Sequence, residues 1–291
     1  MKVSVINGDQ SVFENQIESR PFGFNRDKFD YVDDPYKADW IYLNLHFLNC
    51  NQEFQSIRQT KVYQDNADRC VLWTMHDNPV CAYSDPRPLK FVSQPLYGKE
   101  INEKGNVIPV PLQMRHFEYD LIQDLDFIEE CRNQEKIYDF LYIGQIAYAN
   151  REWLLPENIN LKNYLFRETT PIYGVQDVKE RVSIIKDFCL EVAKSRYCFS
   201  PRGAGSSSFR FYQSLMVGTV PIVSGMNDYP FSGEINWNNF SVIDDSHTKH
   251  NELISYNEHS LRENGMNVWD KYFRIDKTDE HLFCELEKRK I

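Results

Sequence analysis

The sequence lacks the apolar segments that direct a chain to or across a membrane. Nowhere in its 291 residues is there a run approaching the ~20 apolar residues that a membrane-spanning helix needs. Its first ten residues, MKVSVINGDQ, contain no apolar run long enough for a signal peptide. We therefore expect a protein without a membrane span that is located in the cytoplasm.

The cysteines lack the spacing of a disulfide framework or a zinc site. There are seven of them, scattered and without a CxxC pair, which predicts free thiols in a reducing compartment. Cys70, His76 and Cys81 lie close together in the sequence, but no fourth ligand accompanies them. We therefore predict no metal site.

The chain also lacks an excess of positive charge. It carries 43 acidic and 33 basic residues, which give a formal net charge of −10. An acidic surface repels nucleic acids and anionic lipids, so neither is expected as the main partner. Any anion that this protein binds must be held by a few well-placed groups.

The chain does contain short apolar runs that alternate with longer segments of helical length. Runs rich in Val, Ile, Leu and aromatic residues predict buried strands. Their alternation with helical segments predicts an α/β fold in which helices cover both faces of a parallel sheet. Strands are predicted at residues 2–6, 40–45, 71–75, 107–112, 138–143, 163–167, 196–199 and 220–223.

A polar and acidic stretch, residues 115–135, interrupts this alternation. We interpret it as a partly helical connection between two domains. The predicted divisions are an N-terminal domain at 1–130, a C-terminal domain at 131–275 and a C-terminal helix at 276–291.

The clearest helix pattern covers residues 177–194. Val178, Val182, Ile185 and Cys189 recur there at three- and four-residue spacing, as expected for one buried face of a helix. Further helices are predicted at 251–263 and 279–290.

A strand, a glycine-rich turn and a helix follow one another in residues 197–217. The predicted helix starts at Ser206 or Ser207, where open backbone N–H groups and the helix dipole attract anions. Arg210 falls in its first turn, where a cation opposes the dipole unless an anion is close. The pattern favours a phosphate or diphosphate site. The alternative is a solvated turn with a serine N-cap.

This loop matches neither of two common nucleotide-binding motifs. No Gly-Lys-Ser/Thr follows its glycines, so it is not a P-loop, and the spacing is not GxGxxG. Residues 197–203 (YCFSPRG), 208–211 (SFRF) and 218–223 (GTVPIV) instead resemble the exostosin-like glycosyltransferases, glycosyltransferase family 47.

Further segments extend the resemblance, which is strong over 137–245 and thin over the first 130 residues. The stretch 229–242 resembles a second block of that family, and 34–40 (DPYKADW) resembles an N-terminal segment of it. Two positions depart from the family pattern: Gln213 stands in place of a glutamate, and Gly225 in place of an aspartate. The membrane anchor of animal exostosins is absent, which indicates a small soluble viral or bacterial type, in the host cytosol if viral.

The resemblance implies a GT-B fold, in which two Rossmann-like domains face a cleft and the C-terminal one holds a nucleotide-sugar donor. It also implies inverting transfer without an obligatory metal or other cofactor. A metal-free site must neutralise the leaving diphosphate with helix N–H groups and arginines. The candidate donor-binding residues are Arg151, Arg202, Ser206, Ser207, Ser208, Arg210 and Gln213, with Gln213 facing the ribose.

The predicted activity is transfer of a sugar, xylose or another UDP-linked sugar, to a hydroxyl of an oligosaccharide or other glycan acceptor. The alternative is a non-catalytic protein that binds a nucleotide sugar or glycan. Inverting transfer needs a base on the acceptor side. Asp77 or His76, directly after a predicted strand, is the candidate, with His46 in reserve. The alternative for His76 and Asp77 is that they pair with each other and shape the turn before Pro79.

Overall fold

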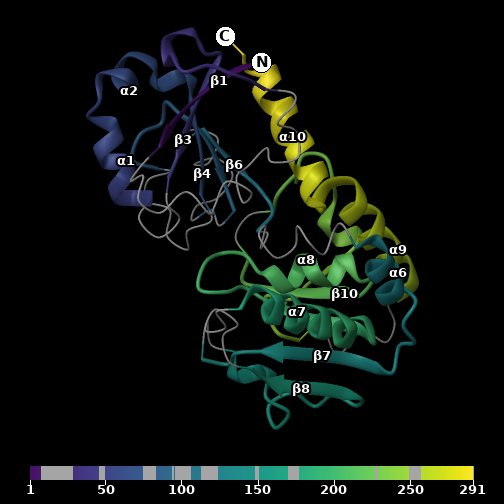
Figure 1. Ribbon diagram of the computed structural model, residues 1–291. Helices are drawn as coiled ribbons and strands as arrows, with labels where there is room; N and C mark the ends of the chain where they lie inside the picture. Colours follow the sequence, from purple (N-terminus) through teal and green to yellow (C-terminus); the bar gives the residue numbers. More distant parts are fainter. Residues whose placement is uncertain are drawn as a thin grey trace. The chain divides into compact units, whose positions relative to one another are not determined.

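The chain folds into two compact units (Figure 1). The computed structural model describes residues 1–7, 29–45, 50–74, 83–93, 95, 106–112, 124–147, 151–169, 177–226, 229–248 and 257–290. The first unit comprises residues 1–112, 227–231 and 276–291, and the second comprises 113–226 and 232–275.

The first unit is built on a six-stranded parallel sheet with strand order β2-β1-β3-β4-β5-β6. Every residue of β3 and β4 is buried, in keeping with strands that are covered on both faces. The strands are β1 (Lys2–Asn7), β2 (Asp30–Tyr31), β3 (Trp40–Asn44), β4 (Cys70–Thr74), β5 (Leu89–Val92) and β6 (Val107–Pro109).

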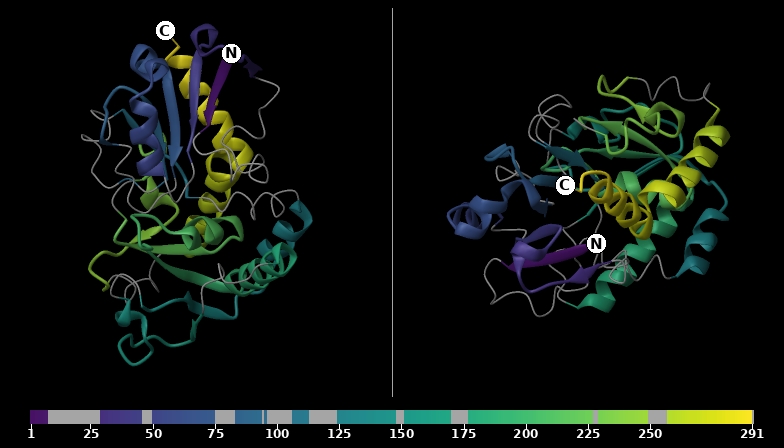
Figure 2. Two further views of the ribbon diagram at one scale, coloured as in Figure 1. Left: turned by 60° about the vertical axis from the view of Figure 1, so that its left-hand side comes forward. Right: turned by 90° about the horizontal axis from the view of Figure 1, so that it is seen from above.

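Helices cover both faces of this sheet. Helices α1 (Cys50–Arg58) and α2 (Lys61–Asn66) pack on one face, against a cluster that includes Ile41 and Leu72. The other face packs against α10 (Ile275–Lys288), whose Leu282 and Leu286 are buried among its apolar side chains. The last helix of the chain therefore belongs to the first unit, and Figures 1 and 2 show it beside the N-terminal strands.

Polar contacts join α10 and the residues that follow it to other parts of the first unit. The indole Nε1 of Trp40 donates to the carbonyl of Leu286 at 3.2 Å. The ammonium of Lys290 lies 2.9 Å from the carboxylate of Asp39. These contacts join residues about 250 positions apart along the chain.

The second unit contains a five-stranded parallel sheet with strand order β11-β10-β9-β7-β8. Its strands are β7 (Tyr138–Gly144), β8 (Tyr164–Glu168), β9 (Ser195–Pro201), β10 (Val220–Ser224) and β11 (Val242–Ile243). Its helices are α6 (Leu125–Arg132), α7 (Val178–Ala193), α8 (Phe209–Met216) and α9 (Glu258–Val268), the last continuing into a π-helical segment, Trp269–Phe273.

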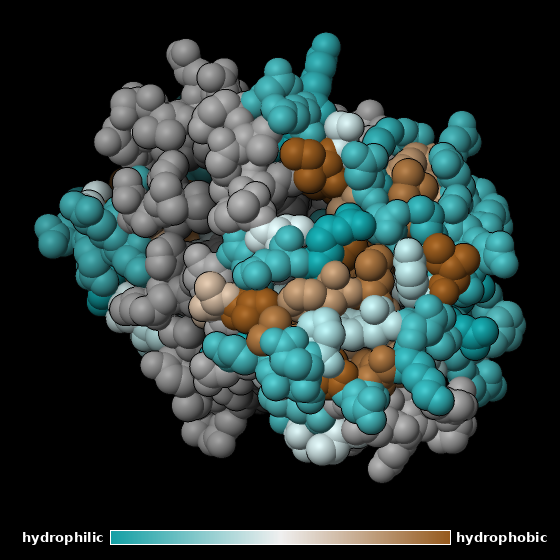
Figure 3. Space-filling view, turned by 90° about the horizontal axis from the view of Figure 1, so that it is seen from below, coloured by the Kyte–Doolittle hydropathy of each residue, from teal (hydrophilic) through white to brown (hydrophobic). Residues whose placement is uncertain are grey.

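Strand β8 forms one edge of the second sheet and lies at the bottom of Figure 1. Its first three residues are half-buried, whereas Arg167 and Glu168 at its end are exposed. In the view from below, Figure 3, apolar side chains are interrupted by hydrophilic ones. Exposed charges such as those of Arg167 and Glu168 oppose pairing of an edge strand with another chain.

The predicted α/β class is confirmed. The two parallel sheets follow one another along the chain, as a GT-B fold requires. That the two units face a cleft stays a prediction. The division differs from the predicted one at residue 130, since α6 belongs to the second unit, where the ammonium of Lys186 on α7 contacts Asp124 at 2.5 Å.

The predicted helix start in the glycine-rich loop is wrong. Helix α8 begins at Phe209, so the three serines before it lie in the loop. Helix α10 begins at Ile275, four residues before the prediction, and α9 covers the described part of the predicted 251–263 helix and extends to Val268. Strands β2, β5 and β11 were not predicted.

Candidate anion-binding site

The carboxyl ends of the second sheet's strands carry a concentration of arginine and serine. In a parallel sheet these ends lie along one edge, and ligands of α/β proteins bind beyond that edge. Here β7 ends at Gly144 and the chain continues to Arg151, while β9 ends at Pro201 and continues to Arg202 and the serines. The two segments touch, because the Arg151 guanidinium (Nη2) donates to the carbonyl of Arg202.

Backbone hydrogen bonds hold the loop at 202–208 in place. The Arg202 N–H donates to the Ser224 carbonyl at 3.0 Å, and the Gly203 N–H donates to the Ser207 carbonyl at 2.8 Å. Ser206 and Ser207 are 4% and 3% exposed, and neither hydroxyl has a hydrogen-bond partner. A buried hydroxyl without a partner costs free energy, so these two groups are unsatisfied hydrogen-bonding groups in the loop.

The start of α8 is not capped by a serine side chain. Ser208 occupies the N-cap position, but its hydroxyl makes no capping hydrogen bond, and the first turn holds no acidic residue. The alternative of a solvated, serine-capped turn is therefore wrong. The first turn of α8 keeps open N–H groups and adds Arg210, a combination that attracts an anion.

Arg210 lies against the end of strand β7. Its guanidinium carbon is 4.8 Å from the ring centroid of Tyr142, a cation–π distance. Its Nε is buried and has no hydrogen-bond partner. A Cβ placed on Gly144 would overlap the Arg210 Nη2 and lie 3.1 Å from the Tyr142 hydroxyl. The Arg210 guanidinium thus packs against the main chain of Gly144, in space that the Cβ of any other residue would occupy.

Arg151 is a buried cation, 6% exposed, whose hydrogen bonds all go to uncharged acceptors. Its Nη1 donates to the Gln145 carbonyl at 2.9 Å and to the Tyr142 hydroxyl at 3.3 Å, while its Nε has no partner. Burial lowers the pKa of Arg151, the nearby Tyr142 opposes that shift, and the positive charges of Arg210 and Arg202 add to it. Because a buried charge without a counter-ion is costly, Arg151 favours an anionic ligand.

Aromatic stacking anchors the segment that carries Arg151. Trp153 stacks on His247 with ring centroids 4.0 Å apart and an interplanar angle of 9°. It also makes an edge-to-face contact with Phe199 of β9, with the ring centroids 5.5 Å apart. Trp153 is therefore held from two sides, and it lies two residues after Arg151 in the 3-10 turn Glu152–Leu154.

We use the term anion site for Arg151, Arg202, Ser206, Ser207 and Arg210. The structure links these residues through the 202–208 loop and through Tyr142, which contacts both Arg151 and Arg210. None of the hydrogen bonds described for these side chains goes to a carboxylate. The arrangement supplies positive charge and open donors, as binding of a phosphate or diphosphate requires.

Gln213 and Gly225, the two departures from the exostosin pattern, both lie near this edge. Gln213 is 7% exposed and follows Arg210 by one turn on the same side of α8. Gly225 has φ of +70°, and a Cβ there would lie 3.1 Å from Cδ of Arg202. Two structural features therefore account for the glycine at position 225: its left-handed backbone conformation and the close approach of the Arg202 side chain.

Tyr142 and Gly144 are the parts of this site that sequence reasoning missed. The sequence YDFLYIG predicts a strand ending in glycine, and that final glycine was the available signal. The predicted catalytic residues His46, His76 and Asp77 lie outside the described residues. Strand β4, which precedes His76 and Asp77, ends at Thr74.

One Asp-x-Asp spacing, Asp124-Leu125-Asp126, occurs and has a structural explanation. Asp124 caps α6 by accepting the Phe127 N–H at 3.1 Å, and the Lys186 contact lowers its pKa, with the cap adding to the shift. In the described part of the chain, no three His, Cys, Asp or Glu side chains gather where they could hold a metal ion. The absence of a metal requirement stays a prediction. Among the described helices, none is both long and apolar enough to cross a membrane.

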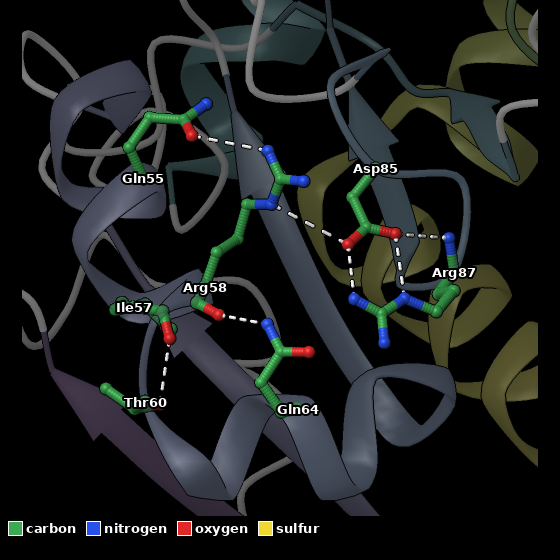
Figure 4. Close-up of polar contacts among 7 residues, drawn as sticks. All are labelled: Gln55, Ile57, Arg58, Thr60, Gln64, Asp85 and Arg87. Atoms are coloured by element: carbon green, nitrogen blue, oxygen red, sulfur yellow. Dashed lines mark hydrogen bonds and ion pairs between the residues drawn. The ribbon is translucent and has the colours of Figure 1, made fainter.

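A second charged cluster lies in the first unit (Figure 4). The Asp85 carboxylate accepts hydrogen bonds from the Arg87 guanidinium at 2.7 and 3.1 Å and lies 3.7 Å from Nε of Arg58. The hydrogen bonds from Arg87 hold the pKa of Asp85 well below its usual range. Asp85 precedes β5 and therefore lies at the amino edge of its sheet, opposite the edge where α/β proteins bind ligands. We interpret this cluster as structural.

Comparison with known protein families finds a match that includes part of the anion site. Residues 159–255 match the Exostosin GT47 domain, a segment that includes the 202–208 loop and α8. Over this segment the chain is similar to the exostosins. The match confirms the resemblance read from the sequence, although it does not bear on a viral or bacterial type.

Two curated relatives are each similar to part of this chain. The Exostosin-1 homolog of Caenorhabditis elegans is 35% identical over 106 residues, which cover 34% of this chain and 28% of that protein. Exostosin-1 of Bos taurus is 33% identical over 88 residues, 26% of this chain and 11% of that protein. The matches thus span less than a third of each relative.

Three solved structures are similar over most of this chain at 7–9% sequence identity. A glycosyltransferase from Rickettsia africae covers 99% of this chain and 98% of its own, with a TM-score of 0.47. The GtfA/B complex covers 87% and 58%, with a TM-score of 0.46. The pneumococcal O-GlcNAc transferase GtfA in complex with UDP and GlcNAc covers 86% and 56%, with a TM-score of 0.42.

Proposed function

We propose that this protein is a glycosyltransferase and that its anion site holds the diphosphate of a nucleotide-sugar donor. The observation that carries the proposal is the pair of buried, unpartnered hydroxyls of Ser206 and Ser207 beside arginines that no described carboxylate neutralises. The match to the Exostosin GT47 domain includes this loop. An anion site in an exostosin-like segment is best explained by a donor's diphosphate.

The proposed chemistry is inverting transfer without an obligatory metal. When the sugar leaves the nucleotide, negative charge develops on the diphosphate. Hydrogen-bond donors that are already in position stabilise this charge most, because they need not reorganise during the reaction. Arg151 and Arg210 are held by Tyr142 before any ligand arrives. The open N–H groups of α8 add a favourable dipole. These groups supply the positive potential that a metal would otherwise provide.

The proposed base is Asp77 or His76, with His46 in reserve. Residues directly beyond the carboxyl end of a parallel strand are placed where α/β enzymes carry their chemistry. Strand β4 ends at Thr74, three residues before Asp77. The base would take the proton of the acceptor hydroxyl while the new glycosidic bond forms.

The proposed donor is a UDP-sugar and the proposed acceptor a glycan. Gln213, one turn after Arg210 and nearly buried, is our candidate for the ribose hydroxyls. Its amide can both donate to and accept from a diol, although without the strength of a charge-assisted bond. The proposal leaves the sugar open between xylose, a hexose and an N-acetylhexosamine.

The experiment that tests this proposal is thermal unfolding of the protein with a panel of nucleotide sugars. A ligand that binds only the folded state raises the melting temperature as its concentration exceeds its Kd. We expect stabilisation by at least one UDP-sugar and by UDP, and none by the free sugars. Stabilisation by no member of the panel would contradict the proposal.

A second candidate is a binding protein that keeps the donor site without turnover. Gln213 is the residue that favours it, since a neutral amide stands where the family pattern has a glutamate. Gly225 gives it no support, because the backbone and Arg202 account for that residue. The two candidates differ in turnover: a transferase slowly releases nucleotide from its donor without acceptor, and a binding protein does not.

A further inference from the structure

We propose that Tyr142 and Gly144 are positioning residues that hold Arg151 and Arg210 as a two-arginine clamp for the diphosphate. The inference rests on the proposed function and deepens it, because it names the parts of the protein that orient the phosphate-binding groups. Both residues lie near the end of β7, nearly 70 positions before Arg210 in the sequence.

Tyr142 contacts both arginines through different parts of its side chain. Its hydroxyl donates to the Gln145 carbonyl at 2.6 Å, which leaves the oxygen free to accept the hydrogen bond from Arg151 at 3.3 Å. The face of its ring lies under the Arg210 guanidinium at 4.8 Å. The side chain itself is fully buried and thus cannot move away from either contact.

Gly144 supplies the surface on which the Arg210 guanidinium rests. Any side chain at this position would overlap Nη2 of Arg210. Pairing limits the movement of this strand, because Gly144 is paired with Glu168 of β8 and β7 pairs with β9 as far as Leu141. The backbone cannot withdraw to make room, so a larger residue would displace the arginine.

The contacts that orient Arg151 and Arg210 do not neutralise their positive charge, which stays available to an anionic ligand. A carboxylate would orient an arginine equally well but would neutralise it. A phenol oxygen, an aromatic face and backbone carbonyls orient the guanidinium groups and leave their charge intact. The Nε atoms of Arg151 and Arg210 are both buried and unpartnered, so each guanidinium keeps an unsatisfied donor.

The adjacent strand offers a matched control. Tyr164 of β8 also donates its hydroxyl to a backbone carbonyl, that of Leu154, at 2.7 Å. No hydrogen bond or cation–π contact between Tyr164 and the Arg151 or Arg210 guanidinium is described, although burial raises the pKa of its hydroxyl and the charge of Arg210 slightly opposes this shift. Tyr164→Phe therefore removes the same kind of hydrogen bond from the same unit without touching the clamp.

The test is calorimetric titration of Tyr142→Phe, Tyr142→Leu, Gly144→Ala and Tyr164→Phe with UDP and with inorganic pyrophosphate. We expect a few-fold loss of affinity for Tyr142→Phe and about tenfold or more for Tyr142→Leu and Gly144→Ala. Tyr164→Phe should stay within about twofold of the wild type. Each titration is repeated at several NaCl concentrations, because weakened guanidinium–phosphate contacts reduce the salt dependence of affinity, whereas a general loss of structure does not.

Three outcomes distinguish the possibilities. Wild-type affinity in all three clamp variants, or losses equal to that of Tyr164→Phe, would overturn the clamp while leaving the anion site in place. Reduced affinity with an unchanged salt dependence would show a structural role only, and would also overturn it. Failure of the wild type to bind either UDP or pyrophosphate would overturn the proposed function and the clamp together, whereas binding of pyrophosphate alone would support the clamp and exclude uridine.

Discussion

The guanidinium of Arg210 lies 4.8 Å from the ring centroid of Tyr142, and that contact joins the first turn of α8 to the end of β7. The same tyrosine accepts a hydrogen bond from Arg151. One buried aromatic side chain thus sets the position of two cations from different segments.

Replacing Arg210 by alanine should weaken UDP binding and leave the fold intact. A charge-assisted hydrogen bond to phosphate is worth about 1.5–3 kcal/mol, roughly 10- to 150-fold in affinity. Calorimetry measures the loss, and thermal unfolding without ligand checks the fold. Arg196→Ala is the control, because Arg196 is exposed at the other end of β9 and pairs with Asp139 at 3.4 Å. Unchanged UDP affinity in Arg210→Ala would show that Arg210 is structural.

Removal of the Ser206 or Ser207 hydroxyl should affect binding but not stability. Neither hydroxyl has a partner among the described residues, so Ser→Ala removes a buried polar group that contributes no described hydrogen bond to the fold. We expect an unchanged or slightly raised melting temperature together with a loss of about 0.5–1.5 kcal/mol in UDP binding for each variant.

Ser195→Ala is the matched control for those two variants. Ser195 is equally buried, but its hydroxyl donates to the Val192 carbonyl at 2.8 Å. It should lose about 0.5–1.5 kcal/mol of stability and keep its UDP affinity. If Ser206→Ala and Ser207→Ala destabilise the protein as Ser195→Ala does and bind UDP normally, these serines serve the fold.

Asp77→Asn and His76→Ala test the proposed base. A residue that takes the acceptor proton should lose about 10²-fold or more in kcat at saturating donor, with donor affinity nearly unchanged. Steady-state kinetics with the acceptor, together with calorimetry of UDP, separates the two effects. A near-wild-type kcat in both variants would remove these residues from the mechanism.

The Asp85–Arg87 cluster should make the first unit less stable in acid. The pKa of Asp85 is depressed in the folded protein, so the cluster stabilises the fold above the unfolded pKa of ~3.9 and loses this contribution as pH falls towards the folded value. Asp85→Asn should lower the free energy of unfolding by about 1–3 kcal/mol at pH 7, and the gap to wild type should narrow below about pH 4.

Chemical unfolding at pH 7 and at successively lower pH values measures that gap. Asp68→Asn is the control, since Asp68 is an exposed residue of the same unit. A gap that stays constant as the pH falls would show that the Asp85 charge does not stabilise the fold.

Much of the fold could be predicted from the sequence because its strands are buried on both faces. Strands β3 and β4 are entirely buried, and such strands appear as continuous apolar runs. Strand β5 was missed because Lys90 interrupts its apolar run, although Lys90 is fully buried in the structure. The return of α10 to the first unit could not be predicted, because it depends on contacts such as Trp40 with Leu286 that local pattern does not encode.

Apart from Arg151, the candidate site was predictable only where its residues are neighbours in sequence. Arg202, Arg210 and the serines share one loop and helix start, so their chemistry could be read together. Tyr142 and Gly144 could not, because their contacts with Arg210 form only when β7 lies beside β9 in the sheet. The serines were misread as helix-starting residues, because serine is common both in N-caps and in anion-binding loops.

The most direct test of the central claim is nucleotide release from UDP-sugars by the wild-type protein in excess chelator. Arginines and the N-terminus of α8 should support departure of the diphosphate without a metal, so we expect slow release of UDP from one donor and faster release with its glycan acceptor. Arg210→Ala should reduce both rates by about tenfold or more. Release of no nucleotide from any donor, or activity that depends wholly on added manganese or magnesium, would contradict the account.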